Sequence, residues 1–127
     1  MTRAVSGGGV VAAGGHRLEL PGGGYFYAPM ILSSVTRDRE IARQEVFGPM
    51  LSFIVYDIFD EALSIANDTA FGLSSCLYSK RTDLVERFVA ESKSGMLRVN
   101  AGSFLENHLP FVGIKDRSMG VVYQTGL

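Results

Sequence analysis

Short apolar runs alternate with helically spaced hydrophobic positions through the middle of the chain. Residues 51–56 are continuously apolar apart from one serine and predict a buried strand. Residues 60–67 place alanine, leucine and isoleucine at helical spacing behind two acids, which predicts a helix. Residues 74–79 and 96–99 predict two further strands. Between them, residues 82–92 predict a second helix, with a threonine at its start as the N-cap.

This order of strand, helix, strand, helix and strand indicates one α/β fold. Short connections between such elements are typical of a parallel sheet with right-handed crossover helices, in a three-layer type of architecture. Gly95 follows the second helix, where a C-cap glycine is expected. Residues 101–127 are polar and interrupted by glycine, so we expect loops at the carboxyl ends of the strands, where ligands bind in such sheets.

The N-terminal part has a different pattern. Residues 1–24 contain three clusters of glycine around the apolar run 10–13, which predicts a short strand between turns. A phosphate-binding loop is the alternative, but no Gly-Lys-Ser/Thr follows and no helical pattern begins after the glycines. Pro29 prevents the aromatic segment 25–27 from continuing as a central strand. Thr36 is then expected to cap a short helix that begins near Asp38 and ends before Phe47-Gly48-Pro49.

Composition and charge narrow the class of protein further. A length of 127 residues with 46% hydrophobic residues predicts one compact domain. A formal net charge of -1 with interspersed charges argues against nucleic-acid binding. The single cysteine excludes an internal disulfide, and two histidines give no metal-ligand spacing. No apolar run reaches about 20 residues, and no signal peptide is evident, so we expect a cytoplasmic protein without a membrane span.

Six short motifs follow one another in a characteristic order over nearly the whole chain. They are Gly24-Tyr25-Phe26 with Pro29, Glu45 with Phe47-Gly48-Pro49, Asp60-Glu61-Ala62 with Ala66-Asn67, Phe71-Gly72-Leu73, Gly95 with Val99-Asn100, and Pro110-Phe111-Val112-Gly113-Ile114-Lys115. Together they resemble the C-terminal part of the catalytic domain of the aldehyde dehydrogenase superfamily. One departure is Val112, which stands where the family usually has glycine and restricts the backbone to negative φ.

This resemblance implies an NAD(P)-dependent parent enzyme that oxidises an aldehyde or semialdehyde to a carboxylic acid. In the family, the nucleophilic cysteine, the glutamate base and the dinucleotide-binding domain lie upstream of these motifs. We therefore expect residues 1–127 to form a partial catalytic domain with no catalytic residue of its own. The parent would use NAD or NADP, whereas cofactor binding or turnover by this chain alone is not expected.

The resemblance also implies roles for individual residues. Glu45 matches the glutamate that hydrogen-bonds the nicotinamide ribose, although a surface acid at a helix end is the competing interpretation. Phe47 matches the aromatic residue beside the nicotinamide ring, or else it is a core residue that anchors the Gly-Pro turn. Leu105, His108 and Phe111 match the border of the substrate tunnel. A solvent-exposed loop histidine is the alternative for His108.

Two residues are interpreted as structural. Cys76 lies within a predicted strand without a neighbouring histidine or helix N-terminus to activate it, so we expect a buried thiol and no nucleophile. Asn100 ends the third strand and is expected to hydrogen-bond nearby backbone through its side chain.

Two other functions remain open. The chain is either a non-catalytic binding or interaction module that retains the fold, or one half of a split enzyme whose other chain supplies the cysteine. If part of a domain is missing, apolar surface is left exposed, and large apolar patches drive association. We therefore expect the chain to form a homo-oligomer. The expected substrate of the parent enzyme is a small-molecule aldehyde.

Overall fold

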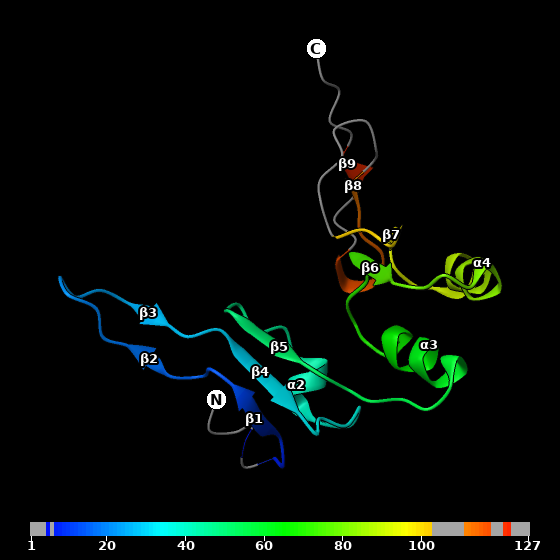
Figure 1. Cartoon of the computed structure of the whole chain (residues 1–127). Coiled ribbons are helices and arrows are strands. Elements are labelled where there is room, and N and C mark those ends of the chain that lie inside the picture. Colours follow the sequence, from blue (N-terminus) through cyan, green and yellow to red (C-terminus); the bar gives the residue numbers. More distant parts are fainter. Residues whose placement is uncertain (1–4, 6, 103–110, 118–120, 123–127) are drawn as a thin grey trace. The chain divides into compact units, whose positions relative to one another are not determined.

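The computed structural model describes residues 5, 7–102, 111–117 and 121–122. The chain divides into two compact units, Met1–Tyr56 and Asp57–Leu127 (Figure 1). Both units are mixed α/β, as the sequence pattern predicted. No helix within the described part of the chain is long and apolar enough to cross a membrane.

A three-stranded sheet forms the centre of the first unit. β1 (Val10–Ala13) pairs antiparallel with β4 (Met30–Ser33), and β4 pairs parallel with β5 (Met50–Ser52). The order β1-β4-β5 therefore places β4 in the middle. The register shifts between Val11 and Ala13, where a β-bulge interrupts the pairing of β1.

The core of this unit is built on one face of β4. Side chains alternate along a strand, and here Met30 and Leu32 point inward with exposed fractions of 3% and 0%. Val35 completes the buried cluster. Burial of one such side chain contributes about 2 kcal/mol. The partly buried residues packed against the cluster are Val11, Ile41, Ala42, Met50 and Ile54, two of which come from the short helix α2 (Glu40–Arg43).

A short hairpin precedes the central strand. β2 (Arg17–Leu18) pairs antiparallel with β3 (Phe26–Tyr27), and the glycine-rich segment between them forms the turn. Pro29 stands between β3 and β4, as the sequence predicted, because it cannot donate a backbone hydrogen bond to a ladder. The strand predicted at residues 10–13 is confirmed as β1.

The second unit contains the crossover pattern. α3 (Phe59–Asn67) is followed by β6 (Ser74–Leu77), α4 (Thr82–Glu91) and β7 (Met96–Val99). β6 and β7 pair in parallel and are joined through α4, which confirms the predicted strand-helix-strand unit. The apolar faces of the two helices bury Leu63 and Phe88.

Polar contacts join α3 to α4 at both ends. The Arg87 guanidinium donates to Glu91 Oε1 within α4 at 2.9 Å and to Asp60 Oδ1 of α3 at 2.6 Å, and these bonds raise the pKa of Arg87. Because these charges are exposed, we expect them to contribute little to stability. At the other end, the Asn67 amide donates to Glu91 O at 2.9 Å and accepts from Lys93 N at 2.7 Å.

The C-terminal region is more regular than predicted. β8 (Phe111–Val112) pairs antiparallel with β9 (Val121–Val122), and a 3₁₀ turn, η1 (Lys115–Arg117), lies between them. The expectation that residues 101–127 are loops is therefore wrong for these segments. Two-residue strands are too short to show a period of two in the sequence.

Both predicted N-caps are wrong. The N-cap positions of α2 and α4 are Arg39 and Arg81, and neither makes a side-chain capping hydrogen bond. The Thr36 hydroxyl donates instead to Asp38 Oδ1 at 2.5 Å, so its side chain turns toward a neighbour rather than a helix end. Thr82 is the first helical residue of α4 and not its cap.

Glycine is required at position 95 for a different reason from the predicted helix C-cap. The C-cap of α4 is Ser92, three residues earlier, and Gly95 does not adopt positive φ. A Cβ at Gly95 would lie only 2.0 Å from the carbonyl oxygen of Val112. The glycine is required by the close approach of β8 and not by the end of a helix.

The strand predicted at residues 51–56 is shorter and more exposed than expected. β5 ends at Ser52 and pairs with β4, whereas the sequence pattern predicted one parallel sheet made of residues 51–56, 74–79 and 96–99. Leu51, Phe53 and Val55 are 55%, 50% and 84% exposed. A fully buried strand needs cover on both faces of its sheet, and the core cluster covers β5 on one face only.

Asn100 has the structural role predicted for it. Its side chain accepts a hydrogen bond from Ser79 N and donates one to Ser79 O, both at 2.9 Å. Asn100 adopts a φ of 53°, a conformation that asparagine tolerates better than most residues. The end of β7 is therefore fastened to the end of β6.

Candidate functional site

The candidate site lies on the connection between α2 and β5. The helix ends at Arg43, and Gln44 is extended, with φ -103° and ψ 139°, so the chain leaves the helix direction there. Glu45 and Phe47 follow at alternate positions, and both are exposed. Gly48 and Pro49 then turn the chain into β5.

Backbone hydrogen bonds attach this turn to the central strand. Met30 N donates to Pro49 O at 2.8 Å, and Met50 N donates to Gly48 O at 2.8 Å. Met30 is almost fully buried in the core, so the turn is attached to a buried position at the start of the central strand. The position of Phe47 is therefore determined by β4 as well as by its own sequence.

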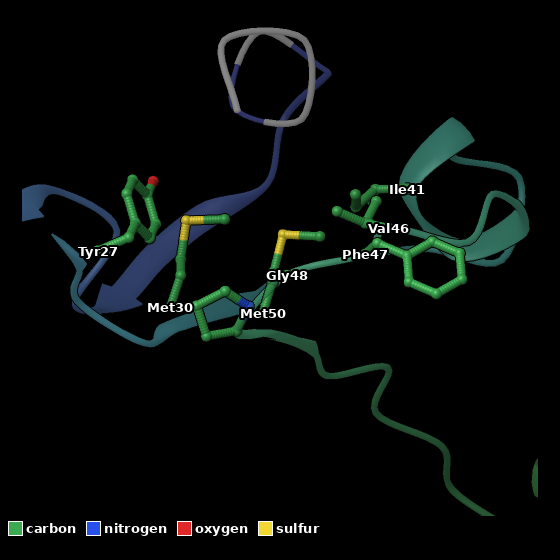
Figure 2. Close-up of a pocket in the computed structure, with 8 residues that line it drawn as sticks. Tyr27, Met30, Ile41, Val46, Phe47, Gly48 and Met50 are labelled. Atoms are coloured by element: carbon green, nitrogen blue, oxygen red, sulfur yellow. The ribbon is translucent and has the colours of Figure 1, made fainter. Parts of the chain in front are cut away.

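An apolar pocket of about 270 Å³ lies beside the turn. Figure 2 shows Met30 and Met50 side by side, with Tyr27 to one side and Ile41 and Val46 to the other. Methionine side chains are flexible and polarisable, and they adapt to flat apolar groups. The lining residues are Tyr27, Met30, Ile41, Val46, Phe47, Gly48, Pro49 and Met50.

The ring of Phe47 is 89% exposed. In Figure 2 the ring extends away from the methionine pair, on the side where Ile41 and Val46 lie. This exposure excludes the interpretation of Phe47 as a core residue within this chain. An aromatic ring presented to solvent on an anchored turn is suited to stacking against a planar group.

Asp38 lies close to the helix before the site and is ionised at neutral pH. The hydrogen bond from Thr36 holds the pKa of Asp38 below its usual value. A lowered folded-state pKa contributes stability that is complete above the unfolded pKa and is lost as the pH falls through the folded pKa, so this contribution disappears only in acidic solution. Glu45 is exposed and interacts with another group of the chain. Its exposure is compatible with a ribose-binding glutamate and also with a surface acid at a helix end.

The predicted substrate residues do not belong to the first compact unit. Phe111 belongs to β8 in the second compact unit and is half-buried. Leu105 and His108 lie outside the described residues. Glu45 and Phe47 are thus brought together in one segment, while the substrate side is represented by Phe111.

Cys76 is exposed, so the prediction of a buried thiol is wrong. Burial alternates along β6, with Ser74 and Cys76 exposed and Ser75 and Leu77 half-buried. Cys76 therefore lies on the more exposed face of β6. Within the described part of the chain, no three histidine, cysteine or acidic side chains form a group that holds a metal ion.

Several residues that line the pocket were not predicted from the sequence as site residues, among them Tyr27, Met30 and Met50. Met30 and Met50 are direct partners in the parallel register of β4 and β5, and Tyr27 ends β3. A methionine at the first position of each strand is a weak signal in the sequence. It becomes informative only when the strand pairing is known.

Parallel strand pairs, a crossover helix and an exposed aromatic ring beside an apolar pocket place the chain in the class of α/β domains that build small-molecule sites. The sequence pattern of the aldehyde dehydrogenase family matches residues 1–126. This chain belongs to the aldehyde dehydrogenase family.

Individual relatives show how much of the family's length is represented. Betaine aldehyde dehydrogenase of Mesorhizobium japonicum is 36% identical over 115 residues, which are 89% of this chain and 24% of the relative. Succinate-semialdehyde dehydrogenase (NADP+) of Saccharomyces cerevisiae is 36% identical over 111 residues, which are 87% of this chain and 22% of the relative. The crystal structure of indole-3-acetaldehyde dehydrogenase with NAD+ resembles this chain with a TM-score of 0.91 and 28% sequence identity. The similarity covers 98% of this chain and 25% of the other.

These similarities confirm the predicted α/β fold class, because known structures share the fold over nearly the whole chain. The chain spans about a quarter of the length of the relatives it matches.

Proposed function

We propose that this chain forms the part of an NAD(P)-dependent aldehyde or semialdehyde dehydrogenase that contacts the nicotinamide half of the cofactor and one wall of the substrate tunnel. The single observation that carries the proposal is the exposed ring of Phe47, which is anchored to the central strand beside Glu45. An exposed aromatic ring and a carboxylate two residues apart fit a nicotinamide riboside.

The chemistry of these two side chains supports the fit. A carboxylate accepts hydrogen bonds from two neighbouring hydroxyls, so Glu45 would hold the ribose diol. The ring of Phe47 would lie beside the planar nicotinamide. The bound cofactor supplies the hydride acceptor, and these residues orient it without taking part in bond breaking. One relative is named for NADP+, and the structure of another contains NAD+. Both support a nicotinamide cofactor in the parent enzyme.

The substrate side of the proposal rests on Phe111. Its half-buried ring would form an apolar wall for the aldehyde, together with Leu105 and His108, which come a few residues earlier in the sequence. The proposed substrate is an aldehyde or semialdehyde, consistent with the names of the relatives. We propose a cytoplasmic enzyme, and we place its nucleophile and general base outside the residues of this chain.

A chimaeric enzyme tests the cofactor role. This chain replaces the matching quarter of the betaine aldehyde dehydrogenase of Mesorhizobium japonicum, and NADH formation from betaine aldehyde is measured. The Glu45→Gln variant is expected to raise the KM for the cofactor about tenfold, because it loses a charge-assisted pair of hydrogen bonds. The Phe47→Ala variant is expected to lower kcat/KM for the cofactor by a similar factor.

Matched variants control for general damage to the chimaera. Glu86→Gln changes an exposed acid on α4, and Tyr25→Ala removes a fully exposed aromatic ring from the N-terminal unit. Both should leave the cofactor kinetics unchanged. A folded chimaera without activity, or equal effects of the control variants, would contradict the proposal. Turnover by the 127-residue chain alone would refute the expectation that its catalytic residues lie elsewhere.

Exposed apolar residues support self-association as part of the proposal. Phe53, Val55 and Ile58 are 50%, 84% and 62% exposed along one short stretch of the chain. Apolar surface of this kind is favourably buried by association. Light scattering of the purified chain is expected to give a mass at least twice that of the monomer. A monomeric mass at high protein concentration would rule this out.

A further inference from the structure

The side chain of Lys115 makes an unusual set of contacts. Its Nζ donates hydrogen bonds to three backbone carbonyl oxygens, those of Asn67 at 3.0 Å, Thr69 at 3.0 Å and Phe71 at 3.3 Å. All three acceptors lie at the end of α3 or on its connection to β6. An ammonium group has three N–H donors, and here each has one acceptor.

The contacts indicate a role for the charge itself. The hydrogen bonds of Lys115 are partly buried, and an ammonium group taken from water needs such partners to offset its lost hydration. Partly negative carbonyl oxygens replace that hydration here, and no carboxylate is among the three acceptors. An uncharged side chain of similar length would leave these three oxygens without their donor.

The backbone of Lys115 supports the same conclusion. Lys115 has a φ of 59°, in the left-handed region that residues with a Cβ rarely adopt. Such conformations persist where surrounding contacts hold them in place, and they concentrate at functional sites. The three hydrogen bonds of the ammonium group are contacts of this kind.

Neighbouring backbone bonds run along the same connection. Ile114 N donates to Gly72 O at 3.0 Å, and Asp116 N donates to Ala70 O at 3.1 Å. The segment around Lys115 is therefore fastened to the connection between α3 and β6 at successive points. Phe111 lies four residues before Lys115, at the start of β8.

We propose that Lys115 is a positioning residue that holds β8 in place and thereby sets the position of the Phe111 ring. The inference rests on the proposed function in one respect, namely that the ring of Phe111 forms a wall of the substrate tunnel. The positioning itself is a property of this chain. The charged group does the positioning, and the alkyl chain alone does not suffice.

A fluorescent reporter tests this without enzyme activity. The protein has no tryptophan, so Phe111→Trp introduces a single reporter in the full chain. Adding Lys115→Met is expected to shift the emission to longer wavelength and to raise acrylamide quenching about twofold, because β8 loses its anchor. Lys115→Arg keeps the charge and the donors and should recover at least half of the change.

The control variant is Lys80→Met, which removes an exposed lysine from the turn between β6 and α4. It should leave the tryptophan signal unchanged. The inference is overturned if Lys115→Met has no effect, if Lys80→Met has the same effect, or if Lys115→Arg is no better than Lys115→Met. Because no catalysis is measured, these results are separate from the outcome of the chimaera experiment.

A measurement on the unmodified chain covers the case in which Lys115→Met does not fold. Acetylation of lysine amines by a water-soluble ester is followed by mass spectrometry under native conditions. Lys115 is expected to react about tenfold more slowly than Lys80 and Lys93, which are both exposed, because its donors are engaged and half-buried. Equal rates for the three lysines would refute the proposed role of the ammonium group.

Discussion

Replacing Gly14 by alanine is expected to destabilise the chain by about 4 kcal/mol, enough to unfold most of the N-terminal unit. A Cβ at this position would lie 1.6 Å from the carbonyl oxygen of Pro29. Gly14 also has a φ of 63°, so alanine would be strained even in open space. Pro29 directly precedes the central strand β4, and neither side of the clash can move without disturbing the sheet. Urea denaturation followed by circular dichroism measures the loss.

Gly23 provides the matched control for Gly14. It has a φ of 72°, but a Cβ there would have no atom within 4 Å. Gly23→Ala therefore tests the backbone strain alone, and we expect a loss of about 1 kcal/mol. If the two substitutions cost the same, the close approach to Pro29 is not what requires glycine at position 14.

Replacing Gly95 by alanine is expected to cost about 3 kcal/mol in the second unit. The added Cβ would lie 2.0 Å from Val112 O and 2.6 Å from Val112 C, where two stretches of backbone meet. Backbone cannot rotate away as a side chain can, so β8 would have to separate from the start of β7. The same denaturation experiment gives the change in free energy. Loss of hydrogen-exchange protection at Ile114 N would locate it, because this amide bonds to Gly72 O.

Gly48 is the control for Gly95. Neither glycine has positive φ, and a Cβ at Gly48 would have no atom within 4 Å. We expect Gly48→Ala to change stability by less than about 1 kcal/mol, as backbone entropy alone would predict. A comparable loss in both variants would mean that the contact with Val112 does not explain Gly95.

Much of the secondary structure was predictable from local pattern. The helix at α3 and the strands β6 and β7 occur where the apolar spacing placed them. Apolar residues recur regularly in these elements because each element packs one side against its own unit. The caps were not predictable in the same way. The hydroxyl of Thr36 had two possible partners, and only the folded chain shows that it bonds to Asp38.

The burial of strands was predicted less well. Residues 51–56 and Cys76 have the composition of buried segments, yet Cys76 and most of residues 51–56 are exposed in the folded chain. Hydrophobicity records that a residue favours burial, but it does not supply the surface that would cover it. The relatives are about four times longer than this chain, so their additional residues are the natural candidates for that cover.

For the candidate site, sequence motifs were enough to single out Glu45, Phe47 and Phe111. They did not identify Met30 and Met50 in the pocket, because these residues are twenty positions apart and meet only through the register of β4 and β5. They also did not show the role of Lys115. Its carbonyl partners are 44 to 48 residues away, and backbone acceptors leave no mark on the side-chain sequence.

Family membership and the class of fold follow from the order of the motifs and the apolar periodicity, since both are properties of neighbouring residues along the chain. Exposure of the Phe47 ring, the reasons for Gly14 and Gly95, and the anchoring of β8 by Lys115 depend on contacts between segments far apart in sequence. A glycine is equally small in a turn, at a helix end or against a passing strand. Only the folded backbone distinguishes these cases, because it alone places the atoms that a Cβ would meet.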